Sequence, residues 1–260
     1  MKDLLIVKVG TNVPAKTNNQ ICQLDDESFK NIGAQIRQLS YNGIKIILVS
    51  SGAITAGIAN DNLCREDIND TAELQRFSAR GWHTIIQKWS AAIGAEKVSA
   101  SLLTKHEIHT AATRQKMLDF MTCCFAHGDI VLVNENDAIC DDKIKFGDND
   151  MLAAALATEL SESKLSRRIR LVLLTNKNGL NKIENDDTTL IRKVINIAKV
   201  ERYACQSNNC NSRGGMVSKI QAARLATTTS VETFIANGRM EHAIVRALNG
   251  EIGTHFIAQS

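Results

Sequence analysis

Short apolar runs alternate with longer amphipathic segments along almost the whole chain. Runs of Val, Ile and Leu bounded by polar or small residues are typical of buried strands, and those of this chain are Leu4–Val9, Ile44–Val49, Val98–Leu103, Ile130–Val133, Leu171–Leu174, Val231–Ala236 and Ile252–Phe256. Apolar residues recur at helical spacing in the segments between them, such as Asp25–Leu39, Asp67–Ile93 and His109–Ala126. Strands that alternate with helices usually pair in parallel and are covered by helices on both faces. The sequence therefore predicts an α/β fold with a parallel or mostly parallel sheet.

Length, charge and cysteine content limit the possible functions. With 260 residues and a net charge of +3, the chain can form a sizeable α/β domain and has no strong field for nucleic acid. No apolar run approaches the roughly 20 residues that span a membrane, and the N-terminus lacks the pattern of a signal peptide. The seven cysteines are odd in number and form no CxxC pair, which indicates reduced thiols. We expect a cytoplasmic protein with no nucleic-acid or membrane partner.

Two acidic clusters bracket one short segment. Asn134–Asp137 follows the strand at Ile130–Val133, at the sheet edge where ligands of open α/β folds bind. Gly147–Asp150 precedes an Ala- and Leu-rich run, where Asp and Asn are good helix N-caps. The alternating segment between them, Ala138–Phe146, is typical of a hairpin. Two interpretations stay open: a polar ligand site, or a capped turn followed by a helix start.

Lysines and small residues mark three candidate anion sites. Lys8 lies in an apolar strand, which is costly unless its ammonium group reaches a partner; the alternative is a lysine whose head reaches water at the strand edge. The small residues Ser50–Gly57 follow a strand and open a helix, an arrangement that presents amide groups to an anion or merely permits tight packing. Gly214 and Gly215 precede a helix with Lys219 in its first turns. Two lysines and a set of carboxylates indicate phosphoryl transfer.

Seven motifs also resemble those of the amino acid kinase family, in the same order over nearly the entire chain. They are KVGT at 8–11, VSSGAITAG at 49–57, LLT at 102–104, VNENDA at 133–138, IKFGDND at 144–150, LLTNKNGL at 173–180 and GGMVSKIQAA at 214–223. The combination of NEND and GDND at this spacing is most similar to the branch of the family that phosphorylates glutamate.

The resemblance implies a fold and an activity. The fold would be a three-layer α/β/α sandwich around an open, mainly parallel sheet of eight strands, and residues 1–260 would form a single domain. The activity would be ATP-dependent phosphorylation of the γ-carboxylate of L-glutamate, the first step towards proline. Mg²⁺ would arrive with ATP, with no protein metal site. The resemblance further implies the short form without a C-terminal PUA domain, and a homo-oligomer.

The resemblance also implies roles for individual residues. Lys8 and Lys219 would contact the transferred phosphoryl group, and Asp150 would hold both lysines. The residues that would bind glutamate are Ser51, Gly52, Ala53, Asn134, Asp137 and Asn149. The residues that would lie along the nucleotide are Gly10, Thr11, Thr175, Asn176, Gly214, Gly215, Met216 and Lys219.

Three departures from the family pattern keep other functions open. Asn176 replaces an aspartate of the nucleotide loop, Trp82 replaces an amide side chain, and Arg213 replaces a threonine. If Trp82 and Arg213 face the cleft, they favour a larger or more anionic ligand; we expect them to point outward, as long side chains on loops usually do. The alternatives are a related kinase with another carboxylate acceptor and a non-catalytic regulator that binds a metabolite.

Overall fold

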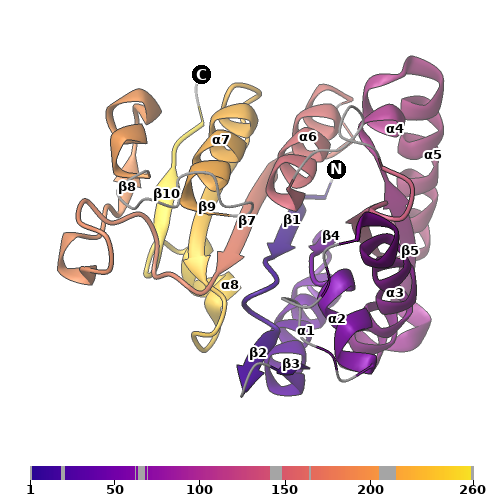
Figure 1. Cartoon of the computed structure of the whole chain (residues 1–260). Coiled ribbons are helices and arrows are strands. Elements are labelled where there is room, and N and C mark those ends of the chain that lie inside the picture. The colour runs from indigo at the N-terminus through magenta and orange to yellow at the C-terminus, as the bar shows by residue number, and fades with distance from the viewer. Residues whose placement is uncertain are drawn as a thin grey trace.

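An eight-stranded sheet lies between two layers of helices in the computed structural model (Figure 1). The structure describes residues 2–18, 21–61, 63, 68, 70–140, 148–163, 165–204 and 215–258. The strand order is β5-β6-β4-β1-β7-β9-β10-β8. The strands are β1 Leu4–Val9, β4 Lys45–Ser50, β5 Val98–Leu103, β6 Ile130–Glu135, β7 Ile169–Thr175, β8 Lys193–Val194, β9 Glu232–Asn237 and β10 Thr254–Phe256. Every pair from β5 to β9 is parallel, and β10 runs antiparallel to β9, so the predicted mainly parallel sheet is confirmed.

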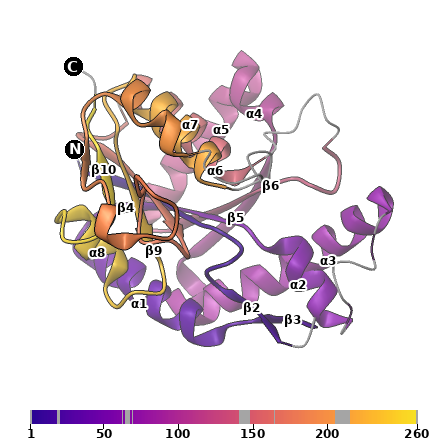
Figure 2. The same cartoon turned by 60° about the vertical axis from the view of Figure 1, so that its left-hand side comes forward.

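The two helical layers cover opposite faces of the sheet (Figure 2). One layer contains α1 Asp26–Tyr41, α2 Ala53–Asn60, α3 Thr71–Ile93 and α8 Ala243–Leu248. The other contains α4 Lys105–His109, α5 Ala111–His127, α6 Asn149–Glu162 and α7 Met216–Thr227. Successive side chains of a strand point to opposite faces. In β1, Leu5 and Val7 therefore pack under the first layer, whereas Leu4 and Ile6 pack under the second. Lys8 follows the same alternation and points towards the layer that contains α6 and α7.

Helices α2 and α3 cross in close contact at two glycines. A Cβ atom at Gly81 would lie 1.8 Å from the carbonyl oxygen of Ala53, and one at Gly57 would lie 2.0 Å from that of Phe77. Gly52 has a different role, because its φ of 103° in the left-handed region lets the chain turn from β4 into α2. The small residues that follow β4 thus permit tight packing, as one of the two interpretations predicted, and the anion-binding role of the turn stays a prediction.

Several short elements have no clear sequence signal. The hairpin of β2 (Ala15–Asn18) and β3 (Ile21–Leu24), strand β8 and helix α8 are too short or too polar for a periodic pattern. The polar residues that follow β5 begin α4, where Thr104 and Glu107 form the reciprocal hydrogen bonds of a capping box. The hairpin predicted at 138–146 lies mostly outside the described residues. None of the described helices is long and apolar enough to cross a membrane.

Candidate active site

Two lysines and one aspartate meet beneath the carboxyl edge of the sheet. Lys8 Nζ lies 2.7 Å from Asp150 Oδ1, and Lys219 Nζ lies 2.9 Å from Asp150 Oδ2. The three residues come from β1, α7 and the second residue of α6, and all are at least 97 % buried. Ser218 Oγ also lies 3.0 Å from Asp150 Oδ2. The predicted association of the three residues is present, and Lys8 does not reach water at a strand edge.

Electrostatic attraction keeps buried Lys8 and Asp150 charged. Burial alone would lower the pKa of Lys8, but the carboxylates of Asp150 and Asp148 outweigh it and hold that pKa above its ordinary value. Burial alone would raise the pKa of Asp150, but the ammonium groups of Lys8 and Lys219 hold it well below its ordinary value. The cluster therefore presents ammonium groups of fixed position and charge, which suits an anionic ligand.

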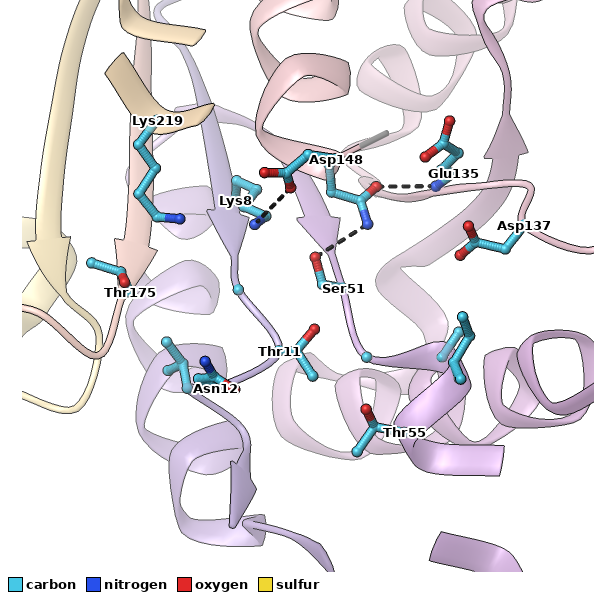
Figure 3. Close-up of a pocket in the computed structure, with 16 residues that line it drawn as sticks. Lys8, Thr11, Asn12, Ser51, Thr55, Glu135, Asp137, Asp148, Thr175 and Lys219 are labelled. Atoms are coloured by element: carbon cyan, nitrogen blue, oxygen red, sulfur yellow. Dashed lines mark hydrogen bonds and ion pairs between the residues drawn. The ribbon is translucent and has the colours of Figure 1, made fainter. Parts of the chain in front are cut away.

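A pocket of about 350 Å³ opens above the three charged residues (Figure 3). Figure 3 shows Thr175 and Lys219 on one side of Lys8, and Ser51 and Asp137 on the other. The predicted site residues that line the pocket are Lys8, Gly10, Thr11, Ser51, Gly52, Ala53, Asp137, Asn149, Thr175 and Lys219. Their place at one edge follows from the parallel register, in which Val9 of β1 lies beside Ser50 of β4 and Leu174 of β7.

Asn149 connects the turn after β4 with the end of β6. Its Nδ2 atom donates to Ser51 Oγ at 3.1 Å and to Asn134 Oδ1 at 2.8 Å, and its Oδ1 atom accepts from the backbone N–H of Glu135 at 3.1 Å. Asn134 is 1 % exposed and lies behind the pocket wall. Because Ser51 Oγ accepts from Asn149, its own proton remains available for a ligand oxygen.

Four residues predicted for the nucleotide and acceptor sites do not line the pocket. Asn134 lies behind the wall as described, Asn176 is exposed next to Thr175, and Gly215 and Met216 form the start of α7. Gly214 lies outside the described residues, as does Arg213. The proposed nucleotide contacts of this group stay predictions.

Six pocket residues were not among the predicted site residues, and three of them are Asn12, Val13 and Ile54. Asp148 caps α6 by accepting from the backbone N–H of Asp150, and it also lies 3.7 Å from Lys8 Nζ. Glu135 is a carboxylate with 3 % exposure that continues β6 into the pocket wall. Thr55 lies in the first turn of α2. A sequence signal was present for Asp148, Glu135 and Thr55, because each belongs to a polar or small-residue segment that follows a strand or opens a helix.

Trp82 points neither into the pocket nor outward. It is 9 % exposed and packs in the core beneath α3, so the expectation that it faces solvent is wrong. Its spacing from Ile85 and Trp89 is helical and places all three on the buried face of α3. The case for an unusual acceptor therefore loses its support at this position.

Carboxylates of the pocket can contact a cation that arrives with a ligand. The described residues contain no cluster of three or more His, Cys, Asp or Glu side chains that could hold a metal ion. Asp148 Oδ2 is nevertheless buried at the pocket without a hydrogen-bond partner among the described residues. Mg²⁺ commonly binds one or two carboxylates together with phosphate oxygens, so this atom fits a Mg²⁺ ion carried by a nucleotide.

Comparisons with known proteins find relatives that match nearly the whole chain. The sequence model of the amino acid kinase family matches residues 3–237. The chain is 34% identical to the glutamate 5-kinase of Shewanella sediminis over 98% of its own length and 68% of that protein. It is 30% identical to the glutamate 5-kinase of Methanosarcina barkeri over the same shares of the two chains.

Solved structures share the fold at lower identity. The carbamate kinase of Giardia superposes with a TM-score of 0.63 at 16% identity, over the whole of both chains. An isopentenyl phosphate kinase superposes with a TM-score of 0.61 at 17% identity, over 97% of this chain and 99% of the other. These likenesses establish the arrangement of the sheet and its helices.

Proposed function

Because this chain belongs to the amino acid kinase family, we propose that it phosphorylates the γ-carboxylate of L-glutamate with ATP. The product is γ-glutamyl phosphate, the first intermediate on the way to proline. The observation that carries the proposal is the buried cluster of Lys8, Asp150 and Lys219 beneath a pocket with polar walls. The curated relatives that match nearly the whole chain are glutamate 5-kinases.

The chemistry of this reaction matches what the pocket offers. A carboxylate is already ionised at neutral pH, so its attack on the γ-phosphorus of ATP requires no general base. Catalysis then depends on aligning the reactants and neutralising the phosphoryl group in transfer. Lys8 and Lys219 supply the positive charge, and Asp150 holds them in place so that they need no rearrangement during the reaction.

The acceptor occupies the β4 and β6 side of Lys8 in this proposal. Glutamate carries an α-ammonium group, for which the carboxylate of Asp137 is the suitable partner. Its carboxylate oxygens accept from the Ser51 hydroxyl and from the amide groups of Gly52 and Ala53 at the start of α2. Asn149 acts on this turn through the Ser51 hydroxyl.

The nucleotide occupies the β7 and α7 side, next to Thr175 and Lys219. Asp148 is the carboxylate that would contact a Mg²⁺ ion arriving with ATP, and such an ion would neutralise part of the negative charge of the phosphates. Asp148 also lies near Lys8, so the same carboxylate helps to balance the charge around the transferred group.

The test is a coupled assay of ADP release over a panel of amino acids, with hydroxylamine present to trap an acyl phosphate. We expect ADP release that depends on both L-glutamate and Mg²⁺, and formation of the γ-hydroxamate. Folded protein that binds ATP but gives neither glutamate-dependent ADP nor hydroxamate contradicts the proposal. ADP release with a different carboxylate in the panel would identify another acceptor.

A further inference from the structure

A buried chain of hydrogen bonds runs from the core to the turn that begins α2. Trp89 Nε1 donates to Ser50 Oγ at 2.8 Å, and Ser50 Oγ donates to the carbonyl oxygen of Ser51 at 3.1 Å. The indole N–H can only donate, and a hydroxyl has a single proton. Because Ser50 Oγ accepts from the indole, its proton points to the Ser51 carbonyl. The direction of the chain is therefore fixed throughout.

The donor end of this chain of hydrogen bonds, Trp89, is held rigidly. Trp89 is fully buried in α3, and its ring packs edge to face against Phe29 of α1 at 4.6 Å between ring centroids. Ser50 is also fully buried and ends β4. A buried indole N–H left without an acceptor is costly, so Trp89 and Ser50 stabilise each other's positions.

The Ser51 residue is fixed from both faces of the sheet. Its backbone N–H donates to the carbonyl oxygen of Val9 in β1 at 3.0 Å. Its hydroxyl accepts from Asn149 of α6, on the face opposite to Trp89. The Ser51 carbonyl is the group of this residue that is oriented from the side of α3, through the hydrogen bond from Ser50 Oγ.

Orientation of that carbonyl decides where the next amide points. In a planar trans peptide the C=O and N–H groups point in opposite directions. With the Ser51 carbonyl directed at Ser50 in the core, the Gly52 N–H is directed away from the core, and Gly52 lines the pocket. Among the described residues the Gly52 N–H donates to no protein group, so it is available to a ligand.

We propose that Trp89 and Ser50 are positioning residues, which aim the Gly52 amide at the acceptor through the carbonyl of Ser51. The inference rests on the proposed function, because it takes the acceptor to be the carboxylate bound at this turn. Neither residue lines the pocket, so neither contacts the substrate directly.

The test compares Trp89→Phe and Ser50→Ala with the control Trp82→Phe. The control removes the other buried indole of α3 but neither of the two hydrogen bonds that connect Trp89, Ser50 and Ser51. We expect Trp89→Phe and Ser50→Ala each to raise KM for glutamate about tenfold, the effect of roughly one misdirected hydrogen bond. KM for ATP should stay within about twofold of the wild-type value. Ser50→Thr keeps the hydroxyl and should restore KM for glutamate, which a loss of stability alone would not explain.

The double variant separates positioning from folding. Ser50→Ala leaves the buried Trp89 indole without an acceptor, and adding Trp89→Phe removes that unpaired donor. The double variant should therefore lose less stability than the two single variants together, while its KM for glutamate stays as high as in either of them.

A second readout requires no substrate. Amide hydrogen exchange over residues 50–56 should be faster in Trp89→Phe and Ser50→Ala than in Trp82→Phe, because the turn is no longer held. The inference is overturned if exchange or KM for glutamate in the first two variants matches Trp82→Phe. If the wild-type protein does not use glutamate, the proposed function fails and the exchange measurement alone still decides whether Trp89 and Ser50 hold the turn.

Discussion

Asp150 occupies a position in which one carboxylate serves two cations. Each of its oxygens faces a different ammonium group, from Lys8 on one side and Lys219 on the other. Two lysines this close would otherwise repel each other in a buried setting. The aspartate therefore permits both charges to remain beneath the pocket, and the three side chains act as one unit.

Removal of any member of this unit should reduce catalysis. We expect Lys8→Ala, Lys219→Ala and Asp150→Ala each to lower kcat by about 10²-fold or more, as the loss of a preorganised contact does. Combined variants should lose less than the product of the single effects. Lys88→Ala is the matched control, since Lys88 forms an exposed ion pair with Asp26 and should leave kcat unchanged. A kcat close to wild type in one of the three variants would remove that residue from the mechanism.

The same unit predicts how stability varies with pH. The pKa of Lys8 is raised from 10.5, so its contribution to stability is complete below that value and is lost as pH rises through the folded-state pKa. The pKa of Asp150 is lowered from 3.8, so its contribution is complete above that value and is lost as pH falls through the folded-state pKa. Between about pH 4 and pH 10 these two groups should add no slope to the free energy of unfolding.

Asp150→Asn should change this behaviour. It leaves buried Lys8 with only the more distant carboxylate of Asp148, so the effect of burial, which lowers the pKa of Lys8, is opposed less than in the wild type. The folded variant binds fewer protons than the unfolded chain, so its stability relative to wild type should rise with pH towards the alkaline limit. Urea unfolding of both proteins at several pH values measures the difference, and a difference independent of pH would contradict this account.

Helices α2 and α3 form the element on which the turn after β4 depends. Their backbones approach at Gly57 and Gly81, where no Cβ atom fits. The close crossing keeps α2 against α3, and Trp89 in the same α3 reaches Ser50. The side of the pocket that we propose for the acceptor is therefore supported by this helix pair.

Gly81→Ala should separate the two helices. Alanine in place of glycine at an exposed position inside a helix stabilises the helix by about 1 kcal/mol. At position 81, however, the added methyl group would overlap the Ala53 carbonyl. We expect a net loss of about 1–3 kcal/mol in the free energy of unfolding, the range for overpacked cores. Ala79→Ser adds one atom to the exposed side of α3 and should change stability by less than about 0.5 kcal/mol. A stabilised Gly81→Ala variant would show that the crossing is not tight.

The molecule as a whole shows which features a sequence can reveal. The central strands carry continuous apolar runs, so β1 and β5 were predicted with the bounds that the structure has. The edge strand β8 has two residues and no such pattern. In the site, the pairing of Lys8 with Asp150 was implied by the resemblance to the family, and the structure places Asp150 in the first turn of α6, 2.7 Å from Lys8 Nζ. Trp82 was expected to point outward because long side chains on loops usually do. It lies in helix α3 instead, on the face that packs against the core.

The central position of β1 separates the pocket into two halves that can vary independently. β4 and β6 supply the residues on one side of Lys8, and β7 with α7 supplies those on the other. Lys8 lies at the junction together with Asp150 and Asp148, the two carboxylates near its ammonium group. Substitutions in one half therefore need not disturb the other. A protein with this sheet can change its acceptor specificity while it keeps its phosphate donor. This modularity makes the turn after β4 and the wall after β6 the places to alter when engineering a different specificity.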